Sequence, residues 1–221
     1  MSGDVGVRSE AEQEMARRRS EFIAGVSHDL KTPLNGIIGF TSVMLMDVAG
    51  KDAELEKKLR LVFESAGVML ERINALVAFH RLEAGVITVE PEWLMPAVLV
   101  AQSVDAMRAA FDKEGLILEV ESGGPARIQS DLKLLSMALH EVLANALRFG
   151  RQGRVRLWLE SEPRANDQVL RFCVADEGIG FQPEKLEAIR RGLRPGRVAD
   201  QFEGLGLGLA LARLSMAGQG G

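Results

Sequence analysis

His28 is the first residue of the chain whose type and surroundings suggest chemistry. Histidine titrates at a pH of about 6.5, so at neutral pH an imidazole nitrogen is available as a nucleophile. Asp29 could accept a hydrogen bond from the other ring nitrogen and fix the tautomer, and Thr32 lies one helical turn further along. Taken alone, an exposed histidine is more often a solvated side chain without a role.

A second group of polar residues recurs between Asp131 and Phe149. Glu141, Asn145 and Arg148 are spaced so that they share one face of a helix. A row of solvated, salt-bridging side chains would account for Glu141 and Arg148. Asn145 is harder to explain in this way, because asparagine is unfavourable inside a helix unless its side chain has a partner.

A glycine-containing turn is predicted after the apolar stretch 169–174. There Asp176 is followed by Gly178 and Gly180. Glycine lets the backbone approach a ligand closely, although an ordinary β-turn would have the same composition. Since a carboxylate accepts hydrogen bonds from an exocyclic amino group, Asp176 is suited to select adenine over guanine.

Three alternating glycines, Gly204, Gly206 and Gly208, open the last apolar segment. The free N–H groups and the positive dipole end at a helix N-terminus attract phosphate oxygens. A dinucleotide-binding motif is a weaker interpretation, because the spacing is not G-x-G-x-x-G. The polar segment 181–203, which is rich in arginine, is either a solvated basic loop or a lid over a nucleotide triphosphate.

Hydrophobic periodicity predicts the elements that position these residues. Glycine and proline are sparse from residue 10 to about 48, which is predicted to be a helix, and apolar residues recur there at alternating spacings of three and four from 23 to 44. The same spacing recurs from 55 to 80. His28 falls at the position farthest from the first apolar seam, so it should face solvent. Two such helices joined by a short loop predict an antiparallel hairpin. Further apolar positions flank both seams, so we expect two hairpins to pair in a homodimeric four-helix bundle.

After Gly85 the period changes to two, which is typical of strands. Strands are expected at 86–90, 116–120, 154–159 and 169–174, with helices near 96–113, near 131–149 and after 206. The prediction is therefore a multidomain α and α+β protein, with a helical hairpin at 1–85 and an α/β sandwich, its sheet covered by helices on one face, at 86–221.

Composition excludes several other classes of protein. The chain has 221 residues, a net charge of −4, 5% aromatic residues and one cysteine, Cys173. A single cysteine permits no internal disulfide, and three separated histidines leave no structural zinc cluster. A slightly acidic chain does not show the basic composition that is typical of proteins that bind nucleic acid. The longest uncharged run, 32–46, is too short to span a membrane, and no signal peptide opens the chain, so we expect a cytoplasmic protein.

Four segments together resemble the sequence boxes of sensor histidine kinases. Residues 22–35, with His-Asp-Leu-Lys-Thr-Pro at 28–33, resemble the phospho-accepting box. Residues 139–149 are similar to the N box, 174–181 to the first glycine box and 204–212 to the second. All four occur in the order of the family and cover nearly the whole chain, so a Bergerat-type ATP-binding domain is expected.

The resemblance implies ATP-dependent autophosphorylation of His28 and transfer of the phosphoryl group to an aspartate of a response regulator receiver domain. Asp29 and Thr32 match the family's pattern for the reverse phosphatase step. In the family, the residue matching Asn145 coordinates Mg²⁺, that matching Glu141 supports the metal or its water, and that matching Arg148 contacts phosphate. Asp176 would bind the adenine amino group. The matching glycines of the two boxes are Gly178, Gly180, Gly204, Gly206 and Gly208.

The chain also departs from the family pattern. Only Phe202 could stand for the phenylalanine-rich box of the lid, and the sequence stops where a final β-hairpin of the sheet is expected. The start of the sequence also leads us to expect no sensor segment before the hairpin. One alternative is therefore a non-catalytic dimeric scaffold or degenerate kinase that docks a response regulator. A chaperone-type or mismatch-repair ATPase is a further alternative, but it leaves the His28 segment unexplained.

Overall fold

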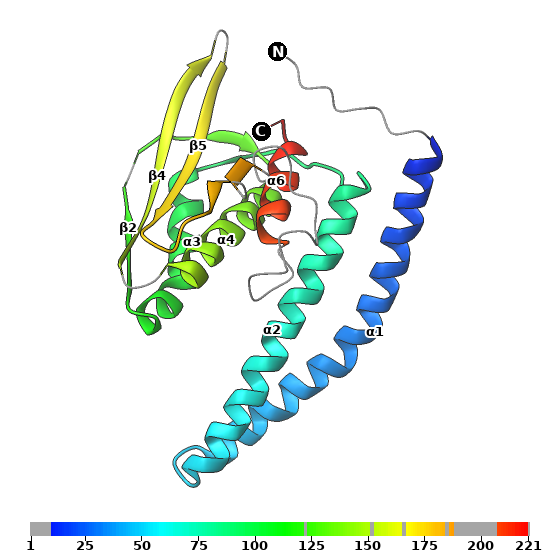
Figure 1. Ribbon diagram of the computed structural model, residues 1–221, viewed down its shortest axis with the longest axis vertical. Helices are drawn as coiled ribbons and strands as arrows, with labels where there is room; N and C mark the ends of the chain where they lie inside the picture. The colour runs from blue at the N-terminus through cyan, green and yellow to red at the C-terminus, as the bar shows by residue number, and fades with distance from the viewer. Residues whose placement is uncertain are drawn as a thin grey trace. The chain divides into compact units, whose positions relative to one another are not determined.

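The computed structural model describes residues 10–121, 123–150, 153–164, 167–183, 186–187 and 207–220. The chain divides into two compact units, Met1–Ile87 and Thr88–Gly221 (Figure 1). Within the described part, the first unit contains only helices, and the second combines strands with helices. The expected helical hairpin followed by an α/β unit is confirmed.

The hairpin consists of α1 (Glu10–Val48) and α2 (Ala53–Glu83), as Figure 1 shows. Gly50 has a φ of 70° in the turn between them, a conformation that favours glycine. The Asp52 side chain then caps α2 by accepting a hydrogen bond from the amide of Leu55 at 3.0 Å. These local signals end one helix and begin the next within four residues.

The face that α1 buries inside the hairpin is not the apolar seam that the sequence pattern identifies. Its buried residues are spaced by seven: Ser20, Ser27, Leu34 and Thr41. The most exposed seam residues keep between 43% and 73% of their side-chain surface in a single chain: Val26, Leu30, Ile37, Phe40 and Met44. Two different faces of α1 are therefore suited to packing, and only one of them is covered by α2.

The second unit contains a mixed sheet whose strand order is β2-β4-β5. The strands β2 and β4 are parallel, and β4 and β5 are antiparallel. A separate antiparallel pair joins β1 and β3. The bounds are β1 (Glu92–Leu94), β2 (Leu116–Val120), β3 (Ile128–Ser130), β4 (Gly153–Arg164) and β5 (Asp167–Asp176).

Three helices, α3 (Pro96–Lys113), α4 (Leu132–Phe149) and α6 (Gly208–Ala217), lie on one face of this sheet (Figure 1). Val155 and Leu157 of β4 are fully buried, in one core with Leu143 of α4 and Phe111 of α3. None of the described helices is both long and apolar enough to cross a membrane.

The prediction of a strand at 86–90 is wrong. Residues 86–91 form no strand, and β1 begins at Glu92. The backbone amide of Glu90 instead donates a hydrogen bond to the Asp131 carboxylate at 2.9 Å. The amide that a β-ladder would use is thus bound by the side chain of Asp131, which lies 41 residues further along the chain. A pattern of five residues could not indicate so distant a partner.

Candidate phosphotransfer and nucleotide sites

His28 lies on the solvent side of α1, as the sequence predicts, with 82% of its side chain exposed. Its Nδ1 atom is 3.4 Å from Oδ1 of Asp29, which is equally exposed. With Nδ1 facing this carboxylate, Nε2 is the ring nitrogen that remains open to solvent. The arrangement offers an accessible nucleophile whose second nitrogen has an acceptor beside it.

Thr32 lies one turn beyond His28 on the same helix. Its hydroxyl donates a hydrogen bond to the carbonyl oxygen of His28 at 3.2 Å. The next residue, Pro33, has no amide hydrogen, yet α1 continues through it. The three residues His28, Asp29 and Thr32 are therefore brought together on one exposed stretch of helix.

The helix α4 carries the polar row predicted from the sequence. Asp131 caps its N-terminus by accepting hydrogen bonds from the amides of Lys133 and Leu134. The opposite face supplies Leu135, Leu139 and Leu143 to the core. This anchoring holds Glu141 and Asn145 half-buried, whereas Arg148 is exposed. The Nδ2 atom of Asn145 is buried and has no hydrogen-bond partner among the residues that the structure describes.

An unpartnered buried amide is costly, so Nδ2 of Asn145 is suited to donate a hydrogen bond to an acceptor that the described residues do not supply. Asparagine also supplies an oxygen of the kind that Mg²⁺ prefers. Among the described residues there is no group of three or more His, Cys, Asp or Glu side chains that could hold a metal. Mg²⁺ is usually held by one or two protein ligands together with substrate phosphates, so the residues present fit this ion.

Gly208 brings the start of α6 against the polar row of α4. A Cβ atom at this position would lie 2.7 Å from Oε2 of Glu141 and 3.5 Å from Nδ2 of Asn145. The N-cap residue of α6, Leu207, makes no side-chain capping hydrogen bond. The structure therefore joins Gly208, Glu141 and Asn145. The other two glycines of this motif, Gly204 and Gly206, lie outside the described residues, as do Phe202 and the arginines of segment 188–206.

Asp176 ends β5, and its side chain shapes the loop that follows. Its Oδ1 accepts a hydrogen bond from the amide of Gly178 at 2.9 Å. The carboxylate is exposed, so its other oxygen is available to a ligand. Gly180 has a φ of 64°, which explains the preference for glycine there.

This loop contacts the C-terminal end of α4. The amide of Ile179 donates a hydrogen bond to the carbonyl oxygen of Phe149 at 3.3 Å. Phe149 lies one helical turn beyond Asn145. The C-terminal half of α4 thus carries Asn145 and contacts both the Asp176 loop and the start of α6. This role of Phe149 could not be predicted from the sequence, because a backbone carbonyl leaves no signal in residue type.

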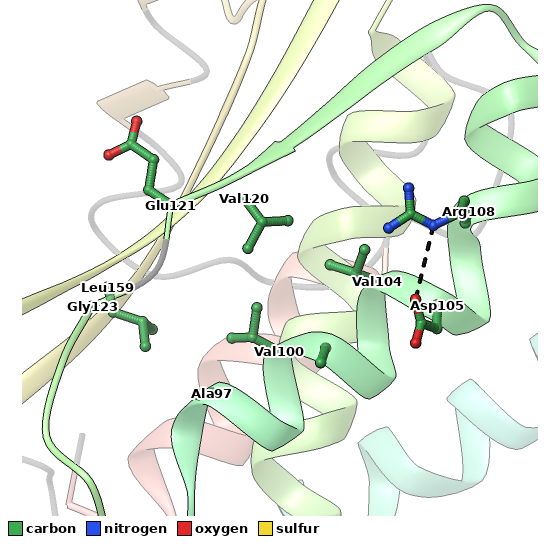
Figure 2. A pocket seen from close by; sticks show the side chains of 10 residues that line it. Ala97, Val100, Val104, Asp105, Arg108, Val120, Glu121, Gly123 and Leu159 are labelled. Atoms are coloured by element: carbon green, nitrogen blue, oxygen red, sulfur yellow. Dashed lines mark ion pairs between the residues drawn. The ribbon is translucent and has the colours of Figure 1, made fainter.

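The cleft in Figure 2 is a different feature of the same unit. It has a volume of about 240 Å³ and lies between α3, which contributes Val100 and Val104, and the strands, which contribute Val120 and Leu159. Arg108 pairs with Asp105 along its edge (Figure 2). Of the predicted nucleotide residues that the structure describes, none lines this cleft.

Two family profiles match the chain. Residues 18–85 match the His Kinase A (phospho-acceptor) domain, and residues 130–221 match the "Histidine kinase-, DNA gyrase B-, and HSP90-like ATPase" family. The chain belongs to the sensor histidine kinases. The second match identifies the α/β unit of this histidine kinase core as an ATP-binding unit.

Two relatives of this histidine kinase core are named as a histidine protein kinase and a sensor protein. Histidine protein kinase DivJ of Caulobacter vibrioides is 31% identical over 90% of this chain and 33% of its own length. Sensor protein GacS of Pseudomonas syringae pv. syringae is 30% identical over 94% of this chain and 23% of its own length. The chain therefore spans a third or less of these two relatives.

A solved structure has a similar fold. Full-length ShkA, crystallised in complex with AMPPNP, superimposes with a TM-score of 0.69 at 29% identity, over 90% of this chain and 41% of that one. Acinetobacter baumannii histidine kinase AdeS shares the fold at 21% identity with a TM-score of 0.52.

Proposed function

We propose that this chain autophosphorylates His28 with ATP and passes the phosphoryl group to an aspartate of a response regulator receiver domain. The observation that carries the proposal is the exposed imidazole, which has Asp29 beside Nδ1 and leaves Nε2 free. In the segment that resembles the phospho-accepting box of sensor histidine kinases, His28 occupies the position of the phosphorylated histidine.

In the proposed reaction, Nε2 of His28 attacks the γ-phosphorus, and the bond from this phosphorus to the bridging oxygen of ADP breaks. Attack by a neutral imidazole leaves a positive charge on the ring, which is lost with the Nδ1 proton. The Asp29 carboxylate, 3.4 Å from Nδ1, stabilises that charge and accepts the proton. Phosphoryl transfer otherwise depends mainly on positioning and charge neutralisation.

The α/β unit would hold the nucleotide at the two loops that meet α4. We assign the adenine amino group to Asp176, with Gly178 and Gly180 forming the loop beside it. We assign the phosphates to Arg148 and to the glycine segment of Gly204, Gly206 and Gly208. The lack of a Cβ atom at Gly208 lets the start of α6 approach Glu141 and Asn145 closely, which supports this assignment.

Mg²⁺ would be held by the Asn145 side chain, with Glu141 supporting the ion or its water. When bound, the ion neutralises charge on the phosphates. The orphaned Nδ2 of Asn145 supports a role for this side chain beyond packing. We also propose that Thr32, with Asp29, serves the reverse phosphatase step, in which the hydroxyl would orient a water molecule.

We further propose residues 1–85 as the dimerisation and phosphotransfer domain and 86–221 as the catalytic domain. The uncovered seam on α1 supports a homodimeric four-helix bundle. At about 25 cal/mol per Å² of apolar surface, leaving these side chains in water is unfavourable, and a second hairpin would cover them. Because ATP and receiver domains are intracellular, we place the activity in the cytoplasm.

The decisive experiment incubates the chain with γ-labelled ATP and Mg²⁺. We expect acid-labile, base-stable label on the wild type and none on His28→Ala or Asn145→Ala. Asp29→Asn should slow labelling by about a hundredfold without weakening ATP binding, since it removes only the proton acceptor. Asp47→Asn, an exposed aspartate on the same helix, is the matched control. Label that survives His28→Ala would contradict the proposal.

A further inference from the structure

Gln219 follows the C-terminal end of α6 and connects it to the N-terminal end of α4. Its side-chain Oε1 accepts hydrogen bonds from the Ser130 hydroxyl at 2.5 Å and from the Asp131 amide at 2.7 Å. Its Nε2 donates to the carbonyl of Ser215 at 3.2 Å. One amide group therefore links the end of α6 to the residues that begin α4.

The residues that Gln219 contacts are themselves held in place. Asp131 is 5% exposed, and its Oδ1 accepts from the amides of Lys133 and Leu134. Its Oδ2 accepts from the amide of Glu90. Gln219 thus binds an anchor that is already fixed by three hydrogen bonds from two segments.

The helices α4 and α6 run antiparallel and pack together along their length. Gln219 contacts Asp131 at one end, and Ser215 donates to Sδ of Met137 at 3.6 Å near the middle. At the other end, Gly208 lies against Glu141 and Asn145. A displacement of α6 along its axis would therefore change the space between its first turn and Asn145.

Apolar packing holds α6 in place, with Leu211 fully buried beside the small residues Ala210 and Ser215. Apolar burial is non-directional, whereas hydrogen bonds depend strongly on distance and angle. The amide of Gln219 supplies this directional restraint.

We propose that Gln219 is a positioning residue for the nucleotide phosphates. It fixes the axial position of α6 on α4, and through it the distance from the first turn of α6 to Asn145. The proposal rests on the nucleotide site proposed above. It predicts that Gln219 affects the binding of the phosphates and not that of adenosine, because Asp176 lies on the β5 loop and not on α6.

The test compares wild type, Gln219→Met, Ser130→Ala and the double variant, with dissociation constants for ATP and adenosine measured by NMR titration. Methionine keeps the length of glutamine but cannot form these hydrogen bonds. We expect Gln219→Met to weaken ATP binding about tenfold and to change adenosine binding less than about twofold. Ser130→Ala should weaken ATP less, and adding it to Gln219→Met should have no further effect.

Gln129→Met is the matched control, because Gln129 is exposed and lies next to Ser130. It should bind both ligands as the wild type does. In autophosphorylation assays, Gln219→Met should raise the KM for ATP and leave kcat nearly unchanged, as expected for a loss of uniform binding.

Unchanged ATP affinity in Gln219→Met, or an equal loss for ATP and adenosine, would overturn the proposal. Additive effects of Ser130→Ala and Gln219→Met would overturn it as well. If Gln219→Met fails to fold, Ser130→Ala decides, since weaker ATP binding with unchanged adenosine binding is still expected. If the proposed nucleotide site itself is wrong, Asn145→Ala should bind ATP with the affinity of the wild type, and this result is separate from the Gln219 test.

Discussion

The carbonyl oxygen of Phe149, in the last turn of α4, accepts a hydrogen bond from the amide of Ile179 in the loop after β5. Gly178, the preceding residue, lies so close that a Cβ atom there would overlap the same carbonyl. The loop that begins at Asp176 is therefore held against the helix that carries Asn145. This contact places the two predicted nucleotide-binding segments next to each other.

Gly178→Ala tests that contact. The Cβ atom would collide with backbone, which cannot move aside as a flexible side chain could, so we expect the loop to be displaced. ATP and adenosine should both bind more than about tenfold more weakly, in contrast to the Gln219 variants. Calorimetric titration measures both affinities. Gly123→Ala is the control, because its Cβ would meet only the Leu159 carbonyl at 3.7 Å.

The exposed seam of α1 is expected to form the dimer interface. Phe40→Glu places a charge at a seam position that is 73% exposed in one chain and that a second hairpin would bury. Burying an unpaired carboxylate is strongly unfavourable, so this variant should be monomeric at micromolar concentration. Light scattering after size exclusion gives the mass directly.

Met46→Glu is the control for this prediction, because Met46 is also highly exposed but lies on the side of the helix away from the seam. It should remain dimeric. A dimeric Phe40→Glu, or a wild type that is monomeric at the same concentration, would show that the seam has another use.

His80 makes the hairpin sensitive to acid. Burial lowers the pKa of His80, the nearby charge of Arg19 lowers it further, and Glu83 opposes both. The folded chain therefore binds this proton less readily than the unfolded chain. The contribution of neutral His80 to stability is complete above the unfolded pKa of about 6.5 and is lost progressively as the pH falls below it.

We therefore expect the Tm of the wild type to fall between pH 7 and pH 5 by more than that of His80→Leu, as measured by circular dichroism. The side chain of His80 is 10% exposed and packs edge-on against Phe79, so leucine can occupy the same buried position. His140→Leu changes an exposed histidine and should keep the full pH dependence. Parallel curves for wild type and His80→Leu would contradict the assignment.

The two long helices could be predicted from the sequence because their pattern repeats over many turns. The scarcity of glycine and proline, together with the apolar spacing, placed the first helix at 10 to about 48, and α1 spans Glu10–Val48. The same pattern placed His28 on the solvent side. At 86–90 the alternation covers only five residues, and the competing hydrogen bond from Glu90 to Asp131 decides the local structure.

Residue types and spacing by themselves determined the helical hairpin, the strands of the mixed sheet and the identity of the candidate groups, because these depend on neighbours a few residues apart. Only the tertiary structure decided that Gly208 faces Asn145, that Phe149 holds the Asp176 loop and that Gln219 reaches Asp131. Such contacts join residues up to 88 positions apart. They arise from the way buried surfaces pack together, which a local pattern does not contain.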